Sequence, residues 1–584
     1  MEYSKLSAPL AAACDRFYEQ GRPALTGPAA LMGLVTVTEP ARPARAVVFL
    51  RGADDAALDR LDCDGLELNE GAGAVRTGIV NLDAVADLAG HDEVVQISVS
   101  HKLSLLMDVA PGKVGVPEFV ERTDLDGDGV VVGVVDTGID SRHSAFAGRV
   151  ERIWDQTMRG NGVPEGKYGV ELTGDRLIES RDDHGHGTHV AGIAAGADEA
   201  YPGIAPKARL VIVKTDLMDA HIADGVRYCF RVARDLGLPA VVNLSLGGHA
   251  DAHDGTDSLS AILDQESGPG RIVVCAAGNE GEDNIHARAE VKEGKTRGIA
   301  CVAAGLFQIN AWYSGSDEME VSVRGPSGSA TPYQKIQTSG SPVRRYFLPD
   351  GVVEIATPGP DRTNGDHQVT VVAAPVPGGG TGPSRAWRIR FRGVKIENGR
   401  VDAWALSGPQ APAEFTGKYV DDAVKVGSPG CATSAMTAAA YTTKNSWTDV
   451  DGNEQEMGFE EDDIADFSSE GPRRDGHPKP DAAAPGAMIA SALSRDADFP
   501  RRLVIDSDHV MLAGTSMASP FLAGVTALLL QQNPQLEPEK AREQFRMASS
   551  VPGQEPGTFD PKWGYGLLAV DKLREGSTAT AQGT

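Results

Sequence analysis

The stretch that most constrains the fold of this chain is a run of small and aliphatic residues at 521–530, which predicts a buried helix. Directly before it stands the motif Gly514-Thr515-Ser516-Met517-Ala518-Ser519-Pro520. The N-terminus of a helix offers unpaired N–H groups, and the helix dipole favours negative charge there. Ser516 is therefore suited to attack a carbonyl and create an oxyanion, although by itself Gly-Thr-Ser before a core helix is more often an N-cap.

Two further segments supply the partners that a nucleophilic serine needs. The apolar run Val130–Val135 has the pattern of a parallel strand buried on both faces, and it ends at Asp136. Catalytic groups of open α/β sheets gather at the carboxyl ends of strands. Residues 184–192, His-Gly-His-Gly-Thr-His-Val-Ala-Gly, open a second small-residue helix. A base to take the serine proton and a carboxylate to orient that base are thus present.

With these motifs the chain resembles the subtilases, the subtilisin-like serine peptidases, whose catalytic residues follow the order Asp, His, Ser. The resemblance implies Asp136 as the orienting carboxylate, His186 as the general base and acid, and Ser516 as the nucleophile. His186 is chosen over His184 and His189 because the family motif is His-Gly-Thr-His-Val-Ala-Gly, with the first histidine catalytic. The expected fold is α/β, a subtilisin-like parallel sheet flanked by helices.

Other segments match the family in the expected order over roughly 120–290 and 420–575. They are Gly203–Pro206, Val241–Gly248, Ile272–Gly281, Phe467–Pro472, Lys479–Asp481 and Ala484–Gly486. The resemblance implies that the side-chain amide of Asn279 donates to the oxyanion beside the backbone N–H of Ser516.

By the same resemblance, a substrate pocket can be outlined. Its predicted residues are Ser245, Leu246, Gly247, Gly248, Ala276, Ala277 and Gly278 along the walls, and Gly427 at or near the floor. These residues are small or uncharged, so they predict an open apolar slot that prefers apolar side chains before the scissile bond. The expected partner is a protein or peptide substrate.

The residues before the catalytic part predict a small α+β domain. Strand-like segments at 46–50, 66–68, 75–82 and 94–99 alternate with helix-like ones at 54–61 and 83–89. This β-α-β-β-α-β order is ferredoxin-like. Directly before a subtilase it resembles the family's propeptide, which implies a chaperone and inhibitor whose tail, about His101–Pro111, lies in the active site. An ordinary α+β domain would show the same pattern.

A long insertion separates Asn279 from Pro429, where simple subtilases have only a short loop. Its alternating segments at 319–323, 368–372, 387–391 and 401–405 predict an inserted antiparallel β-sandwich, jelly-roll-like. We favour a packing role for it over a partner-binding surface. The sequence thus predicts an N-terminal helical segment (1–35), a propeptide-like domain (36–112), a catalytic domain in two parts (113–300 and 418–577), the sandwich (301–417) and a flexible tail (578–584).

Composition narrows the partners and the compartment. A net charge of −27 without a basic block argues against nucleic acid and anionic membranes. We find no apolar stretch of about 18 residues that would span a membrane. The six cysteines show no disulfide framework, and no signal peptide is evident at the start. These features predict a cytoplasmic protein in a reducing compartment, with non-standard export still open.

No metal or cofactor is predicted. Residues Asp124, Asp126 and Asp128 match the first half of a calcium loop, but Val135 stands where that motif has a bidentate glutamate. A turn is the preferred interpretation. The family's strong calcium site uses an aspartate at the position of Ala145, so the resemblance does not support that site, although calcium elsewhere stays possible.

Two alternatives to an active peptidase stay open. One is a pseudo-peptidase that acts as a binding or chaperone protein through the inserted sandwich; an incomplete triad would have signalled it, and the motifs are complete. The other is an enzyme that an uncleaved N-terminal domain keeps latent.

Overall fold

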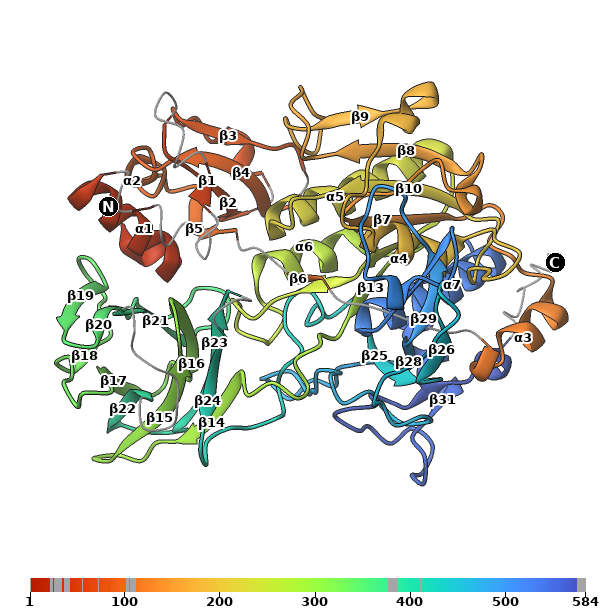
Figure 1. The fold of residues 1–584 in the computed structure, drawn as a ribbon. Helices are drawn as coiled ribbons and strands as arrows, with labels where there is room; N and C mark the ends of the chain where they lie inside the picture. The colour runs from red at the N-terminus through yellow and green to blue at the C-terminus, as the bar shows by residue number, and fades with distance from the viewer. Residues whose placement is uncertain are drawn as a thin grey trace, which may run out of the picture.

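A computed structural model describes residues 2–21, 25, 34–35, 43–54, 56–71, 73–100, 104–105, 112–376, 386–408 and 412–574. These residues form three packed units (Figure 1). We call them the N-terminal unit (described residues up to 100), the sandwich unit (286–416) and the central unit, which comprises the rest. The predicted flexible tail 578–584 and most of the predicted inhibitory segment 101–111 lie outside the described residues.

A ten-stranded sheet forms the middle of the central unit, in the order β31-β32-β28-β25-β13-β11-β7-β10-β8-β9. All neighbouring pairs are parallel except those that add the edge strands β9 and β31. The strands are β7 (Val131–Asp136), β8 (Val150–Asp155), β9 (Val170–Leu172), β10 (Arg209–Lys214), β11 (Ala240–Leu244), β13 (Arg271–Ala276), β25 (Met436–Thr442), β28 (Ala482–Ala487), β31 (Ser549–Ser550) and β32 (Leu567–Leu568).

Helices cover both faces of this sheet, as predicted for an α/β fold. One face carries α3 (Val116–Thr123), α4 (His186–Ala195), α7 (Thr515–Gln532) and α8 (Pro538–Ala548). The other carries α5 (Asp219–Leu236) and α6 (Ser258–Glu266). Val132 and Val134 of β7 pack toward the first set, whereas Val131 and Val135 pack toward the second. Apolar side chains on both faces explain the unbroken apolar run of this strand.

Strands of the N-terminal unit occupy the four segments expected from the sequence. They are β2 (Arg45–Gly52), β3 (Leu66–Leu68), β4 (Val75–Asn81) and β5 (Val94–Val99), with the short β1 (Leu34–Val35) added at one edge. The spatial order is β5-β2-β4-β3, and all neighbours are antiparallel. The helix expected at 54–61 is only a 3-10 turn at Leu58–Arg60, and α2 spans Val85–Leu88. A longer helix, α1 (Ala8–Gln20), packs between this sheet and the sandwich unit.

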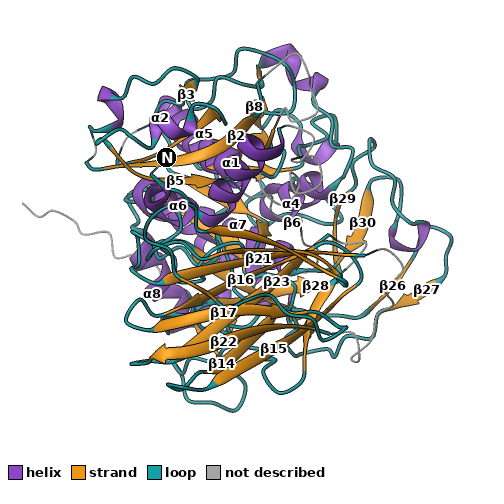
Figure 2. Ribbon diagram, turned by 90° about the vertical axis from the view of Figure 1, so that its left-hand side faces the viewer, coloured by secondary structure: helices purple, strands orange, loops and turns teal. Residues whose placement is uncertain are grey.

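Two antiparallel sheets make up the sandwich unit and enclose their own apolar core (Figure 2). One contains β14 (His286–Glu290), β23 (Arg400–Ser407), β16 (Phe307–Tyr313), β21 (His367–Pro375), β20 (Gly351–Ala356) and β19 (Val343–Leu348). The other contains β18 (Gln334–Lys335), β17 (Glu318–Arg324), β22 (Trp387–Lys395), β15 (Thr296–Ala303) and β24 (Ala413–Thr416). The unit begins at β14, earlier than the predicted boundary at residue 301, because β14 pairs with β23.

Short elements complete the description. Three two-stranded sheets of the central unit lie outside its large sheet. They pair β6 (Ser104–Leu105) with β12 (Leu246–Gly247), β26 (Ser446–Thr448) with β27 (Glu454–Glu456), and β29 (Ile489–Ala492) with β30 (His509–Leu512). The remaining 3-10 turns are Tyr3–Lys5, Gly112–Val114, Ser144–Phe146, Gly174–Glu179, Arg501–Leu503 and Val570–Lys572.

Buried polar contacts join the N-terminal unit to both other units. Arg16 of α1 forms a two-pronged ion pair with Glu354 of β20, with N–O distances of 3.0 and 2.7 Å. On the other side, the carboxylate of Asp224 on α5 accepts hydrogen bonds from Asn69 and Thr77. Because buried charges and polar groups are costly without partners, these contacts fix how the units dock.

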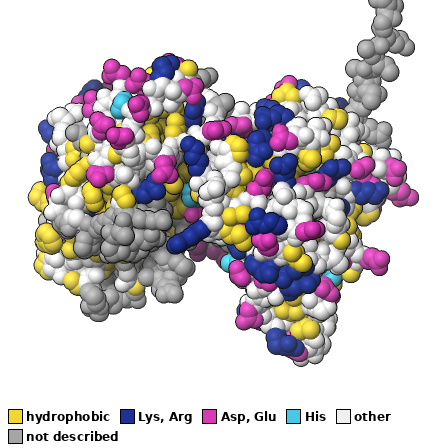
Figure 3. Space-filling view, turned by 90° about the horizontal axis from the view of Figure 1, so that it is seen from above, with side chains coloured by type: hydrophobic (Ala, Val, Ile, Leu, Met, Phe, Trp, Pro, Cys, Tyr) yellow, Lys and Arg dark blue, Asp and Glu magenta, His cyan; other side chains and the backbone are white. Residues whose placement is uncertain are grey.

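Acidic and basic side chains are interspersed over the face that Figure 3 shows. Among the residues that the structure describes, no helix combines the length and the apolar character needed to cross a membrane. All six cysteines lie in described segments and are free thiols.

Candidate active site

The carboxyl end of β7 and the first turn of α4 bring Asp136 and His186 together. His186 Nδ1 lies 2.7 Å from Asp136 Oδ1, and both side chains are fully buried. The same carboxylate oxygen accepts the main-chain N–H of Thr137. A Cβ at Gly187 would stand 2.3 Å from the oxygen of Gly138, so only glycine lets the helix approach the strand this closely. The His-Gly step of the motif thus has a steric cause.

The structure separates the three histidines of this motif. His189 is fully buried, and its Nε2 donates toward the carbonyl oxygens of Ile489 and Val510 at 3.2 and 3.3 Å. Burial, together with the nearby His186, lowers the pKa of His189 to about 3, so this ring is neutral and structural. His184 is exposed. Only His186 contacts the carboxylate of Asp136, as the resemblance implied.

Ser516 lies in the first turn of α7 and is tied to the loop after β11. Pro520 has no N–H, so it cannot make the helical hydrogen bond to the carbonyl of Ser516. Ser245 Oγ donates to that carbonyl at 2.6 Å, and Ser516 Oγ donates to the carbonyl of Ser245 at 2.9 Å. Asn243 supports the arrangement by contacting both Ser245 and Ser519.

Asn279 lies next to the same helix N-terminus. Its side-chain oxygen accepts hydrogen bonds from the N–H of Thr515 at 2.9 Å and from the Thr515 hydroxyl at 3.0 Å. Because the oxygen of this amide is held by donors, its NH₂ group is the end that is left to donate. The N–H of Gly278 also donates to the Thr515 hydroxyl, at 3.1 Å. The segment 276–279 is therefore fixed against the helix that carries Ser516.

The predicted pocket residues lie along three neighbouring segments. Strand β12 contains Leu246 and Gly247, and Gly248 donates from its N–H to the oxygen of Ser428 at 2.9 Å. A Cβ at Gly427 would stand 2.0 Å from the oxygen of Gly248, so the two chains can approach only because residue 427 is glycine. On the other side, Ala276 is the last residue of β13 and Ala277 follows it; both are buried.

The edge of β12 is paired with a segment of the N-terminal part. Strand β6 runs antiparallel to it, with Leu105 opposite Leu246 and Ser104 opposite Gly247. These two residues belong to the segment predicted to occupy the active site; its other residues lie outside the described part of the chain.

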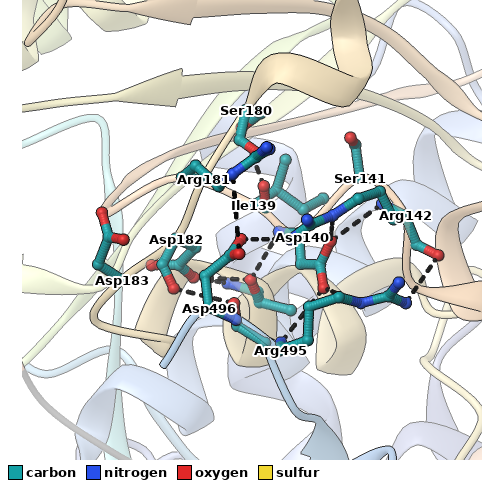
Figure 4. Close-up of polar contacts among 12 residues, drawn as sticks. Ile139, Asp140, Ser141, Arg142, Ser180, Arg181, Asp182, Asp183, Arg495 and Asp496 are labelled. Carbon is teal, nitrogen blue, oxygen red and sulfur yellow. Dashed lines mark hydrogen bonds and ion pairs between the residues drawn. The ribbon is translucent and has the colours of Figure 1, made fainter. Parts of the chain in front are cut away.

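Figure 4 shows a polar network that holds the turn after β7, the approach to α4 and the 494–496 loop. The buried carboxylate of Asp182 accepts from the hydroxyl of Thr137 and from the N–H groups of Gly185 and Thr188. This negative charge lies at the N-terminus of α4, where the helix dipole favours it. The side chain of Asp182 thereby connects the turn after Asp136 with the helix that begins at His186.

A second carboxylate in Figure 4 anchors the same turn. Asp140 pairs with Arg142 Nε at 2.7 Å and with Arg495 Nε at 2.9 Å. Although burial opposes its charge, the hydrogen bonds from these two residues hold the pKa of Asp140 below its ordinary value. Arg142 also pairs with Asp496, so the loop from 494 is fastened to the turn after β7.

The model of the subtilase family of peptidases (Peptidase_S8) matches residues 127–371 and 416–566. The chain belongs to the subtilase family. The matching segments contain Asp136, His186, Asn279 and Ser516, the four residues assigned from the resemblance.

Similar proteins carry protease names. The subtilase-type proteinase psp3 of Schizosaccharomyces pombe is 34% identical over 164 residues, which are 27% of this chain and 31% of that protein. The serine protease AprX of Bacillus subtilis is 35% identical over 125 residues, 21% of this chain and 26% of that protein. The matches thus span less than a third of either relative. The solved CspB protease of Clostridium perfringens has a similar fold, with a TM-score of 0.64, 23% identity, and coverage of 79% of this chain and 97% of that chain.

Sequence reasoning missed several charged residues around the pocket. The carboxylate of Glu280 lies beside Gly278. A Cβ added to Gly278 would stand only 2.6 Å from Glu280 Oε2. Burial opposes its charge, but His249 and Ser469 contact the carboxylate and hold the pKa of Glu280 below its ordinary value. In the sequence, only the position of Glu280 directly after Asn279 indicates that its carboxylate lies near the pocket. The pocket is therefore less purely apolar than its wall segments suggest.

Two more carboxylates lie behind the pocket floor. Asp251 accepts the N–H of Ser428 at 3.0 Å, and Asp257 accepts its hydroxyl at 2.9 Å. Burial and the adjacent charge of Asp257 raise the pKa of Asp251 above its ordinary value. Asp251 and Asp257 lie far from Ser428 in the sequence, so no local motif could have predicted these contacts.

Of the three aspartates weighed for calcium, Asp126 has protein partners. Asp126 pairs with Lys207 at 2.8 Å and also accepts the N–H of Asp128. Near Ala145, the guanidinium of Arg149 donates to the carbonyl oxygens of Ala145, Ala195 and Ala208. A positive charge thus lies among carbonyl oxygens beside the position at which the family's strong site would have its aspartate.

Proposed function

We propose that this subtilase is a serine endopeptidase in which Ser516 is the nucleophile, His186 the general base and acid, and Asp136 the orienting carboxylate. The contact that carries the proposal is the buried 2.7 Å hydrogen bond between His186 and Asp136. It fixes the ring so that Nδ1 carries the proton and Nε2 is the basic nitrogen. His186 takes the Ser516 proton during attack on the peptide carbonyl and then delivers it to the leaving amine.

Two donors are placed to stabilise the oxyanion that this attack creates. One is the main-chain N–H of Ser516 at the N-terminus of α7, and the other is the side-chain NH₂ group of Asn279. The helix dipole adds a favourable potential at this point. Loss of one such side-chain donor costs about 2.7–4 kcal/mol of transition-state stabilisation, a value measured in a subtilisin.

Ser516→Ala and His186→Ala should each lower peptide hydrolysis by several orders of magnitude, because the nucleophile and its base act as one unit. His184→Ala is the matched control: this exposed histidine lies two residues away, its ring only touches that of His186 edge-on with centroids 6.1 Å apart, and its loss should lower the rate far less. Initial rates with a chromogenic peptide measure the difference. Undiminished hydrolysis by purified Ser516→Ala protein, or equal losses in the two histidine variants, would contradict the assignment.

We further propose that large apolar side chains are preferred before the scissile bond. The supporting residues are the small ones along the pocket, above all Gly427 at the floor. Each methylene group that fills an apolar pocket strengthens binding of the transition state by about 1–3 kcal/mol. Cleavage profiling with a peptide library should therefore be dominated by Phe, Leu, Met or Tyr. A profile dominated by Lys or Arg would show that the Glu280 carboxylate, rather than the apolar walls, sets the preference.

The N-terminal unit, we propose, is a ferredoxin-like propeptide that keeps the intact chain latent, and the sandwich unit is a rigid jelly-roll-like support. The pairing of β6 with β12 supports latency, because a peptide substrate would add to this edge as a strand. A tethered segment competes at an effective concentration near millimolar, so its own affinity can be modest. The buried contacts of Asp224 with Asn69 and Thr77 hold the unit over α5.

Asp224→Ala should loosen this docking and increase peptide hydrolysis by the intact chain severalfold. Each buried donor that is left without its acceptor lowers the stability of the docked arrangement by about 1–3 kcal/mol. Asp235→Ala is the control, because Asp235 is on the same helix but pairs only with Arg231. Mass spectrometry must show that both chains are uncleaved when the rates are compared. Equal rates in the two intact variants and the wild type would count against inhibition by this unit.

For metals, we propose that the strong calcium site of the family is replaced here by Arg149. The guanidinium contacts with the carbonyl oxygens of Ala145, Ala195 and Ala208 support this. A ligand that binds only the native state raises the melting temperature. Since the proposal removes this calcium site, millimolar Ca²⁺ should leave the melting temperature of the wild type nearly unchanged. Arg149→Met should melt at a lower temperature, since each of the three carbonyl oxygens loses a hydrogen bond from the guanidinium. A rise of many degrees on adding Ca²⁺ to the wild type would contradict the proposal.

A further inference from the structure

Three side chains that bind metals in proteins converge on the N-terminal unit, away from the candidate active site. They are Cys63, in the loop before β3, Asp87 of α2, and His91, in the turn between α2 and β5. One ligand atom from each lies within 4.8 Å of the other two. Across the described residues, no other group of three His, Cys, Asp or Glu side chains meets this condition. Nothing in the proposed peptidase mechanism uses these residues.

The backbone holds the three side chains close to a binding geometry. Cys63 Sγ lies 3.8 Å from Asp87 Oδ2. A tetrahedral zinc ion with bonds of about 2.0–2.3 Å needs its ligand atoms about 3.3–3.8 Å apart, so only small side-chain movements are required. Main-chain hydrogen bonds fix each position: Leu66 N–H donates to Cys63, Gly90 N–H to Asp87, and Val94 N–H to His91.

The chemistry of the set selects among metals. A thiolate, an imidazole and a carboxylate together suit Zn²⁺, whereas Ca²⁺ and Mg²⁺ require oxygen ligands. Cys63 is also the only one of the six cysteines that is not buried, so it is the cysteine most open to solvent. The remaining cysteines are buried away from any such cluster.

The surroundings of the cluster are negative. Asp62 and Asp64 flank Cys63 in the sequence, and the carboxylate of Glu93 lies 3.8 Å from His91 Nδ1. Carboxylates beside a metal-binding histidine commonly orient its ring and raise its basicity. Lys5 is the exception, because its ammonium group donates to the main-chain oxygen of His91 and also pairs with Glu2.

We propose that Cys63, Asp87 and His91 bind one Zn²⁺ ion, with water as the fourth ligand. Binding replaces the thiol proton of Cys63, which leaves to solvent as the S–Zn bond forms. The ion joins the loop before β3 to the turn after α2. The helical elements between the strands of this sheet are short, Leu58–Arg60 and Val85–Leu88. Zinc would therefore stabilise the N-terminal unit, independently of whether Ser516 is catalytic.

The test uses the full chain with Ser516→Ala, which removes the proposed self-cleavage, after dialysis against a chelator. One equivalent of Zn²⁺ should slow iodoacetamide alkylation of Cys63 by about tenfold or more, because the metal withholds the thiolate. Since the other cysteines are buried, alkylation of the native protein reports Cys63, and peptide mapping verifies the site. Co²⁺ in place of Zn²⁺ should give a thiolate charge-transfer band and tetrahedral absorption in the visible range.

Substitutions of the proposed ligands test whether all three side chains bind the same Zn²⁺ ion. In the same background, His91→Gln and Asp87→Asn should each abolish most of the protection, whereas Asp92→Asn, which changes a charge outside the cluster, should keep it. Circular dichroism verifies that each variant is folded. Protection that is equally strong in His91→Gln would reveal binding by the thiol alone and overturn the proposal. So would unchanged alkylation of the parent at one equivalent of Zn²⁺ together with no Co²⁺ thiolate band.

Discussion

The position of the candidate nucleophile depends on a missing helical hydrogen bond. Pro520 leaves the carbonyl of Ser516 without its partner in α7, and the hydroxyl of Ser245 donates to it instead. Ser516 returns a hydrogen bond to the carbonyl of Ser245, so the first turn of the buried helix is locked to the segment that leads into β12. The same residues therefore fix both the reactive hydroxyl and the edge along which a peptide would lie.

The parallel sheet brings the rest of the site to this point. Because β7, β11 and β13 run in one direction, their carboxyl ends meet at the same edge of the sheet. Asp136 at the end of β7 thus lies at the same edge as Ser245 and Asn279, which follow the other two strands. Carboxylates then hold the connecting loops, Asp182 at the N-terminus of α4 and Asp140 between two arginines. The N-terminal unit packs over α5 and α6 on one side and against the sandwich unit on the other, which brings β6 to the edge of β12.

Local motifs predicted much of this arrangement. The apolar run before Asp136, the His-Gly step and the small-residue helix after Ser516 each have a steric or burial cause that the sequence itself displays. Contacts between distant segments could not be predicted in this way. Arg149 among three carbonyls and Arg16 opposite Glu354 depend on how whole units pack. Cys63, Asp87 and His91 likewise come together only through the turns of the N-terminal unit.

The central claim is that the buried pair Asp136–His186 activates Ser516. The most direct measurement is reaction of the protein with a fluorophosphonate probe, followed by mass-spectrometric mapping of the adduct. The account predicts one adduct, on Ser516, which forms far more slowly when Asp136 is replaced by alanine because the imidazole then loses its orienting partner. An adduct on a different serine, or labelling of Ser516 at the same rate in Asp136→Ala, would contradict it.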